Sequence, residues 1–258
     1  MVVMNISSIG SNSYINYEQL ASGKKINSAA DDAAGLAIAK KLETQSNGYD
    51  VGANNAATSQ NMINVADGAL ASVNDSLQRI RELSVQASNT AVYGDDEIGA
   101  MQAEIDQLKQ HISDVAGNTQ FNTLNLLDGS MTASNVASSP DGSGMQINLP
   151  DSTLEALGIA DFDVTGNFSI SDIDKAIEKV SQARSSLGAQ SNALDSVQAY
   201  NSYASYNLTA AQSRTEDLDF PKAISDLEKN RVLEEYRLLM QKKQQEEDER
   251  VVKLYGNL

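Results

Sequence analysis

The residues that could do chemistry in this chain of 258 residues are few and widely spaced. The chain has one histidine, His111, and no cysteine, so zinc sites of the usual kind cannot be assembled. Carboxylates adjoin at residues 31–32 and 95–97, but negative charge there suits the start of a helix. No phosphate-binding glycine loop and no Gly-x-Ser-x-Gly motif is present. The sequence therefore predicts no enzyme, no cofactor and no metal site.

The net charge of −16 limits the partners of the chain. A chain this acidic is repelled by phosphate backbones and by anionic lipid, so neither nucleic acid nor membrane is an expected partner. No apolar run approaches the roughly 20 residues that cross a bilayer. Residues 1–13 lack the basic start and the apolar core of a secretory signal peptide, so no cleaved signal peptide is expected.

The clearest pattern is an apolar seam between residues 171 and 213. Its positions are spaced alternately by three and four, which is the period of a coiled coil. Ser171 is the expected N-cap of this helix, with Asp174 as its capping-box partner. The seam consists of Ile173, Ala176, Val180, Ala183, Leu187, Gln190, Leu194, Val197, Asn201, Ala204, Leu208 and Ala211.

Two earlier helices have the same period. One is expected from about Ala53 to just before Gly94, and the other is expected to end at Gly117, where a C-cap glycine belongs. Because no single helix can bury its own seam, the pattern predicts a mainly α fold, an elongated antiparallel bundle or coiled coil of three long helices. The first seam is Ile63, Ala66, Leu70, Val73, Leu77, Ile80, Ser84 and Ala87, and the second is Ile98, Met101, Ile105, Leu108, Ile112 and Val115.

Shorter elements are expected outside these helices. Residues 145–149 alternate apolar and polar side chains, which predicts a strand, and residues 140–144 form a turn cluster before it. Residues 153–157 are expected to form one helical turn ended by Gly158. Residues 28–45 are expected to form a separate short helix, with Ser28 and Asp31 as a capping box.

Three segments, in this order and spacing, resemble the two ends of bacterial flagellin, the subunit of the flagellar filament. They read QLASGKKINSAADDAAGLAIA at residues 19–39, NTQFNTLNLLDG at 118–129 and SRTEDLDF at 213–220. The resemblance implies a structural subunit that polymerises head-to-tail into a helical propeller for motility. It also implies export by the flagellar type III pathway to the extracellular flagellum.

The resemblance implies a domain plan as well. Residues 1–45 correspond to an N-terminal core and spoke segment, and residues 216–258 to a C-terminal core-type helix. Residues 46–215 correspond to a helical rod domain with a short β-hairpin and loop region at 118–169. The gap between residues 129 and 169 is too short for outer domains, so the chain resembles a minimal flagellin.

Two departures from the family leave an alternative open. Only 18 residues precede Gln19, and residues 241–250 form a block without an apolar side chain where the family's C-terminal helix is mostly uncharged. The chain could therefore be an accessory flagellin, or a hook–filament junction-type protein, that assembles poorly alone.

The resemblance also implies partners. They are other copies of the chain, a flagellar export chaperone, the filament cap and the animal toll-like innate receptor for flagellin. Arg79 and Leu83 carry over as central receptor contacts, with Leu83 as an apolar anchor, and the receptor set is Gln78, Arg79, Leu83, Gln86 and Glu104. The spoke and assembly motif is Asn27, Ser28, Asp31, Asp32 and Gly35.

Overall fold

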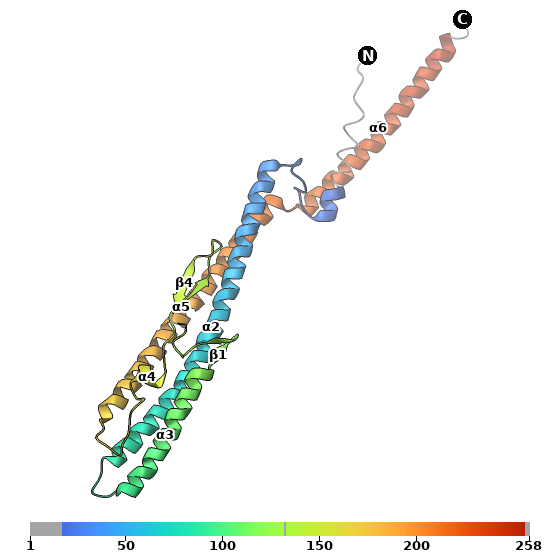
Figure 1. The fold of residues 1–258 in the computed structure, drawn as a ribbon. Helices are drawn as coiled ribbons and strands as arrows, with labels where there is room; N and C mark the ends of the chain where they lie inside the picture. Colours follow the sequence, from blue (N-terminus) through green and yellow to red (C-terminus); the bar gives the residue numbers. More distant parts are fainter. Residues whose placement is uncertain (1–16, 132, 256–258) are drawn as a thin grey trace. The chain divides into compact units, whose positions relative to one another are not determined.

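The computed structural model describes residues 17–131 and 133–255, with side chains to residue 250 (Figure 1). The expectation for residues 1–13 lies outside these described residues. A short helix at residues 17–22 precedes the labelled elements. These are α2 (Ala33–Ala87), α3 (Asp95–Asn118), β1 (Gln120–Phe121), β2 (Leu124–Asn125), β3 (Ser134–Ala137), β4 (Gly144–Ile147), α4 (Leu154–Leu157), α5 (Ile170–Glu216) and α6 (Phe220–Tyr255). The fold is mainly α, as predicted.

The chain forms two compact units. Met1–Thr44 and Asn207–Leu258 make the first unit, and Gln45–Tyr206 makes the second. The helices α2 and α5 each contribute residues to both units. In the second unit α2, α3 and α5 lie side by side (Figure 1), and bonds such as Arg184 to Asp67 join them.

The predicted seams of the three long helices form the core. Each seam position is buried or half-buried, and the eight positions of the first seam are all buried. The fully buried side chains include Leu70, Leu77, Ile80, Ile105, Ile112, Ile173 and Leu187. Because small and medium apolar residues fill these positions, the helices approach closely without a thick aromatic core.

The expected break between residues 45 and 53 is wrong, because α2 runs without interruption through it. Gly48 and Gly52 lie in this stretch, and tertiary packing explains them. An added Cβ would lie 2.6 Å from the Pro140 Cβ at Gly48 and 2.2 Å from the Ser138 carbonyl oxygen at Gly52. These glycines let the turn that joins β3 and β4 lie against the helix, so they do not end it.

Two predicted helix ends are also wrong. Gly117 lies within α3, whose C-cap is Thr119, and the Thr119 N–H donates to the Val115 carbonyl. The helix α5 begins at Ile170, so Ser171 lies in its first turn. Asp174 accepts a hydrogen bond from Arg81 at 2.6 Å and takes no part in a capping box.

The short elements between α3 and α5 agree with their patterns. The strands β3 and β4 pair antiparallel, with Val136 opposite Met145. Gly158 ends the helical turn α4, as predicted; Thr153 is its N-cap, and Gly158 is in the left-handed conformation. The smaller hairpin β1–β2 turns through two residues of positive φ, Asn122 and Thr123. A positive φ is strained for the β-branched Thr123, so the surrounding structure must hold this turn.

The helix α6 belongs to the first unit and exposes apolar side chains. Ile224, Val232, Tyr236, Leu238 and Leu239 are each more than half exposed. The described residues contain no helix both long enough and apolar enough to span a membrane.

Candidate functional site

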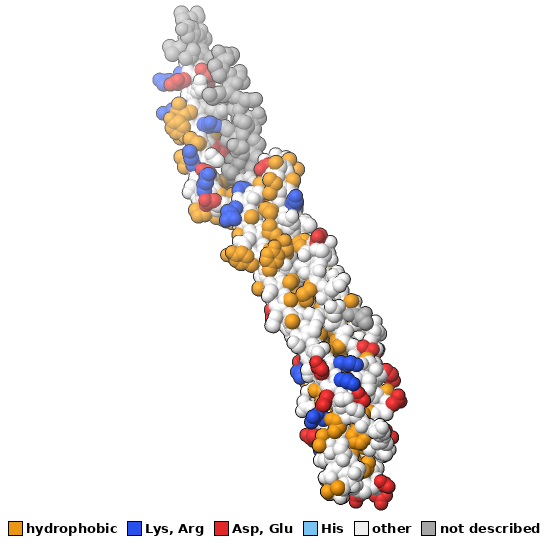
Figure 2. Space-filling view, turned by 90° about the vertical axis from the view of Figure 1, so that its left-hand side faces the viewer, with side chains coloured by type: hydrophobic (Ala, Val, Ile, Leu, Met, Phe, Trp, Pro, Cys, Tyr) orange, Lys and Arg blue, Asp and Glu red, His pale blue; other side chains and the backbone are white. Residues whose placement is uncertain are grey.

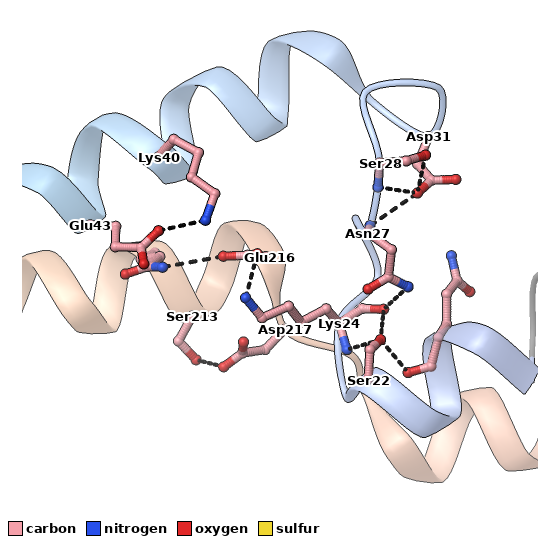
Figure 3. A network of polar contacts seen from close by, with 12 residues as sticks. Ser22, Lys24, Asn27, Ser28, Asp31, Lys40, Glu43, Ser213, Glu216 and Asp217 are labelled. Carbon is pink, nitrogen blue, oxygen red and sulfur yellow. Dashed lines mark hydrogen bonds and ion pairs between the residues drawn. The ribbon is translucent and has the colours of Figure 1, made fainter.

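The segment 27–32 folds into a tight turn that one carboxylate organises (Figure 3). The Oδ2 atom of Asp31 accepts hydrogen bonds from the backbone N–H of Ser28 at 2.8 Å and of Asn27 at 3.0 Å, and from the Ser28 hydroxyl. These bonds, first that from the Ser28 N–H, hold the pKa of Asp31 below its usual range. Ser28 and Asp31 therefore close a turn ahead of the helix, and the prediction that they cap it is wrong.

The start of α2 is fixed by the next carboxylate. Asp32 accepts a hydrogen bond from the Gly35 N–H at 2.9 Å, which is the role of an N-cap residue. Gly35 has no space for a side chain, because an added Cβ would lie 2.3 Å from the Asp32 Oδ2 and 2.8 Å from the Ile26 Cδ1. Ile26 is itself buried. The turn, the cap and the glycine therefore depend on one another.

The chain just before this turn pairs with the chain that ends α5. The Lys25 N–H donates to the Glu216 carbonyl at 2.7 Å, and the Leu218 N–H donates to the Gly23 carbonyl at 2.9 Å. Lys24 and Asp217 form the antiparallel bridge between these two bonds. Residues almost 200 positions apart in the sequence are thus joined in one small sheet-like contact.

An ion pair between a buried carboxylate and the Lys24 side chain, which is 42% exposed, secures the same contact (Figure 3). Glu216 is 3% exposed, and its Oε1 lies 2.7 Å from the Lys24 Nζ. Gln212 donates to the second carboxylate oxygen at 3.2 Å. The hydrogen bond from Lys24 is the main cause that lowers the pKa of Glu216. The sequence analysis did not predict this pair. Lys24 and Glu216 lie in two separate segments, and nothing in either segment indicates that the two side chains face each other.

The ion pair predicts an acid-sensitive contact. An unfolded glutamate titrates near pH 4.3, and the folded pKa of Glu216 is lower. Stabilisation by the pair is therefore complete at neutral pH and is lost as the pH falls through the folded pKa. We expect Glu216→Gln to speed hydrogen exchange at the amides of Lys25 and Leu218 at pH 7, and the difference from wild type to shrink at an acidic pH below the unfolded value of about 4.3.

Exchange measured by mass spectrometry at both pH values checks this prediction. Glu43→Gln is the matched control, because Glu43 pairs with Lys40 at 2.7 Å but has a side chain that is 40% exposed. An exposed pair contributes little, so the control should exchange like wild type. Equal exchange by Glu216→Gln and wild type at pH 7 would contradict the role of the pair.

The residues predicted to bind a receptor lie where α2 and α3 face each other. The Arg79 Nε donates to Glu104 at 2.8 Å, and its Nη1 donates to Glu82 at 3.1 Å. The hydrogen bond with Glu104 is the main cause that raises the pKa of Arg79. Gln78 and Gln86 are exposed on the same helix. Four of the five predicted receptor residues, all except Leu83, therefore lie at the surface. Arg79 is already paired with Glu104 and Glu82.

Leu83 does not lie on this surface. It is 2% exposed and belongs to the core cluster with the seam residues Ile80 and Ala87. The expectation that it forms an exposed apolar anchor is wrong, because a helix position three residues after Ile80 also faces the core. Any contact made at this face must come from the polar side chains around it.

Comparisons with known proteins match both ends of the chain. A family model described as the bacterial flagellin N-terminal helical region matches residues 3–132, and the C-terminal helical region of the same family matches residues 170–254. The chain is 34% identical over 239 residues to flagellin FlaB2 of Treponema pallidum (strain Nichols), covering 84% of this chain and 83% of that one. It is 32% identical to flagellin of Bacillus subtilis (strain 168), with 96% and 94% covered.

Solved structures agree. The crystal structure of Bacillus cereus flagellin aligns with a TM-score of 0.51 and 26% identity, covering 57% of this chain and 88% of that one. A putative flagellar hook-associated protein from Vibrio parahaemolyticus aligns with a TM-score of 0.58, covering 72% of this chain and all of that one. Its identity of 17% indicates a shared fold alone.

Proposed function

This chain belongs to the bacterial flagellin family, and from that premise we propose how its turn motif and its charged helix face are used. As a flagellin it is a structural protein, a subunit that assembles with copies of itself into the extracellular filament of the flagellum. A head-to-tail contact that does not close on itself gives an open helical polymer. The proposals concern the residues that make this possible.

We propose that Asn27, Ser28, Asp31, Asp32 and Gly35 form the assembly motif. The observation that carries this is the small contact between residues 23–25 and 216–218, because it fixes the two ends of the chain in one geometry. The turn held by Asp31 leads directly from that contact into α2. Polymerisation needs every copy to present its ends alike, and this motif supplies that uniformity. The assembly yield of a Gly35→Ala variant tests the proposal.

The residues can also be assigned to the rod and to the inner core layer of the filament. We propose that residues 46–215 form the rod and that residues 1–45 and 216–258 form the inner core layer. The division of the compact units after Thr44 supports the first of these boundaries, whereas the second division falls after Tyr206, within the proposed rod. The exposed apolar side chains of α6 also support the assignment, because such side chains are expected to be covered by neighbouring copies.

The export route of the chain and its other flagellar partners are proposed from its membership of the flagellin family. The chain is expected to leave the cell through the flagellar type III pathway, to be held before export by a chaperone and to be added beneath a filament cap. We further propose that it performs no catalysis. This proposal rests on membership of a family of structural proteins.

A role in innate recognition is proposed for the face of Gln78, Arg79, Gln86 and Glu104. Arg79 offers a planar set of donors that Glu104 and Glu82 already orient, which supports it as the centre of a binding patch. We expect Arg79→Asp to weaken binding to the toll-like receptor for flagellin by about 2 kcal/mol, since it replaces the donors with a third carboxylate.

Binding of purified monomer to receptor ectodomain, measured by surface plasmon resonance, checks this prediction. The matched control is Arg81→Asp, because Arg81 is a similarly exposed arginine of the same helix that pairs instead with Asp174. The control should bind like wild type. The proposed face is wrong if wild type fails to bind or if both variants lose the same affinity. Circular dichroism must show unchanged helix content in each variant.

A further inference from the structure

Charge is distributed unevenly between the two compact units. Gln45–Tyr206 carries 6 Lys and Arg against 20 Asp and Glu, a net charge of −14 out of −16 for the whole chain. The other unit is therefore close to neutral. Where copies of this chain pack through Gln45–Tyr206, like charges repel across the interface.

Every cation of this unit already has a partner within it. The four that pair with carboxylates are Arg79, Arg81, Lys175 and Arg184. Lys109 donates to the carbonyl of Phe162, and Lys179 donates to the carbonyl of Ala156. The six lysines and arginines of the unit therefore all have partners within it, and its 20 carboxylates far outnumber them. A contact that buried this acidic surface would leave carboxylates desolvated and unpaired, which is strongly unfavourable.

One part of the unit avoids this problem, and we name it the uncharged belt. It consists of residues 45–66 of α2 and residues 196–206 of α5, with Asp50 as its only charged residue. The two segments lie side by side, since the hydroxyls of Ser46 and Ser205 are 2.9 Å apart. The rings of Tyr49 and Tyr200 also pack edge to face, with centroids 6.1 Å apart.

The uncharged belt also exposes large apolar side chains. Tyr200, Tyr203 and Tyr206 are 63%, 71% and 72% exposed, and Val51 is 58% exposed. In Figure 2 the red and blue side chains of this unit gather towards the lower end of the visible face, and the stretch above them is mostly white and orange. Tyrosine provides large contact area together with a hydroxyl that can bond to a partner, which suits it to protein interfaces.

We propose that the uncharged belt is the surface on which a second copy of this chain packs in the filament. The proposal rests on self-assembly and names the face that makes the contact. A second copy is the occupant because a cationic partner would be drawn to the acidic remainder of the unit, whereas another acidic copy is repelled from it. The belt is where two such units can meet with little like-charge repulsion, and its tyrosines supply the apolar area.

The absence of cysteine from the chain makes a direct test possible. Tyr206→Cys places a single thiol on the uncharged belt, and Val92→Cys places one on an equally exposed side chain, 70% exposed, beside the acidic start of α3. Each variant is copolymerised with an excess of wild type, and its reaction with a maleimide is compared in monomer and filament. We expect the thiol at 206 to react about tenfold more slowly in the filament and the thiol at 92 to react as before.

The outcomes separate this proposal from assembly itself. Protection at 206 alone supports the belt as the interface. A thiol at 206 that stays fully reactive in filaments overturns the proposal, and so does equal protection at both positions, because burial would then not be confined to the belt. If folded wild type formed no polymer, self-assembly itself would be refuted, and with it the proposal that rests on it. Tyr206→Asp should abolish pelleted polymer while Val92→Asp leaves it unchanged, and the reverse result would also overturn the belt.

Discussion

Leu194→Asp should prevent residues 45–206 from folding. Leu194 is 1% exposed in the seam of α5, and its seam neighbour one turn earlier, Gln190, is bonded to the backbone of Asn148. A carboxylate at this position would be buried without a cation, which costs several kcal/mol against a typical total stability of about 5–15 kcal/mol. The milder Leu194→Ala should cost about 2–4 kcal/mol, since it only removes apolar contacts. Thermal unfolding followed by circular dichroism measures both effects.

Ala189→Asp is the matched control for Leu194→Asp. It introduces the same charge into the same helix, five residues away, at a position that is exposed. We expect it to unfold within a few degrees of wild type, because a solvated carboxylate on a helix face costs little. If Leu194→Asp unfolded at the same temperature as this control, the seam of α5 would not be a core element and the helical packing would be wrong.

Gly35→Ala should disrupt the turn motif and reduce filament yield to a small fraction of wild type. The added methyl would overlap both the Asp32 carboxylate and Ile26, closer than van der Waals contact, so either the cap or the buried isoleucine must move. Overpacking of this kind costs about 1–3 kcal/mol, and here it falls where the chain leads from the contact between the two ends into α2. Sedimentation of polymer measures the yield, and hydrogen exchange at the Leu36 amide reports the helix start.

Gly68→Ala separates this effect from ordinary helix propensity. Gly68 lies in the same helix with nothing within 4 Å of an added Cβ, so alanine should stabilise α2 by about 0.5–1 kcal/mol. This variant should assemble like wild type. A Gly35→Ala chain that assembled equally well would show that the motif does not set the geometry of the ends.

The long helices could be predicted from the sequence because their seams repeat. A period of three and four over many turns has few structural explanations, and positions such as Leu77, Ile112 and Leu187 are fully buried in the structure. Gly158 was also predictable, since a glycine after one helical turn commonly takes the left-handed conformation that it shows here.

The remaining features depend on contacts between distant residues. Gly48 and Gly52 resemble helix breakers until the turn that lies against them is known. Ser28 and Asp31 match a capping box, but the structure places the helix start beyond them and uses the pair to close a turn. The ion pair of Lys24 and Glu216 joins positions 192 residues apart, and periodicity within either segment carries no information about the other.

Electron microscopy of the purified chain tests the account most directly. Folded monomer is concentrated under conditions that promote polymerisation, with seeds cut from preformed filaments, and is then examined by negative stain. The account predicts long helical filaments built from this chain alone, because its two joined ends and its uncharged belt supply the contacts between copies. Folded chains that remain monomeric with seeds present, and that polymerise only beside a second flagellin, would contradict it and identify the chain as an accessory subunit.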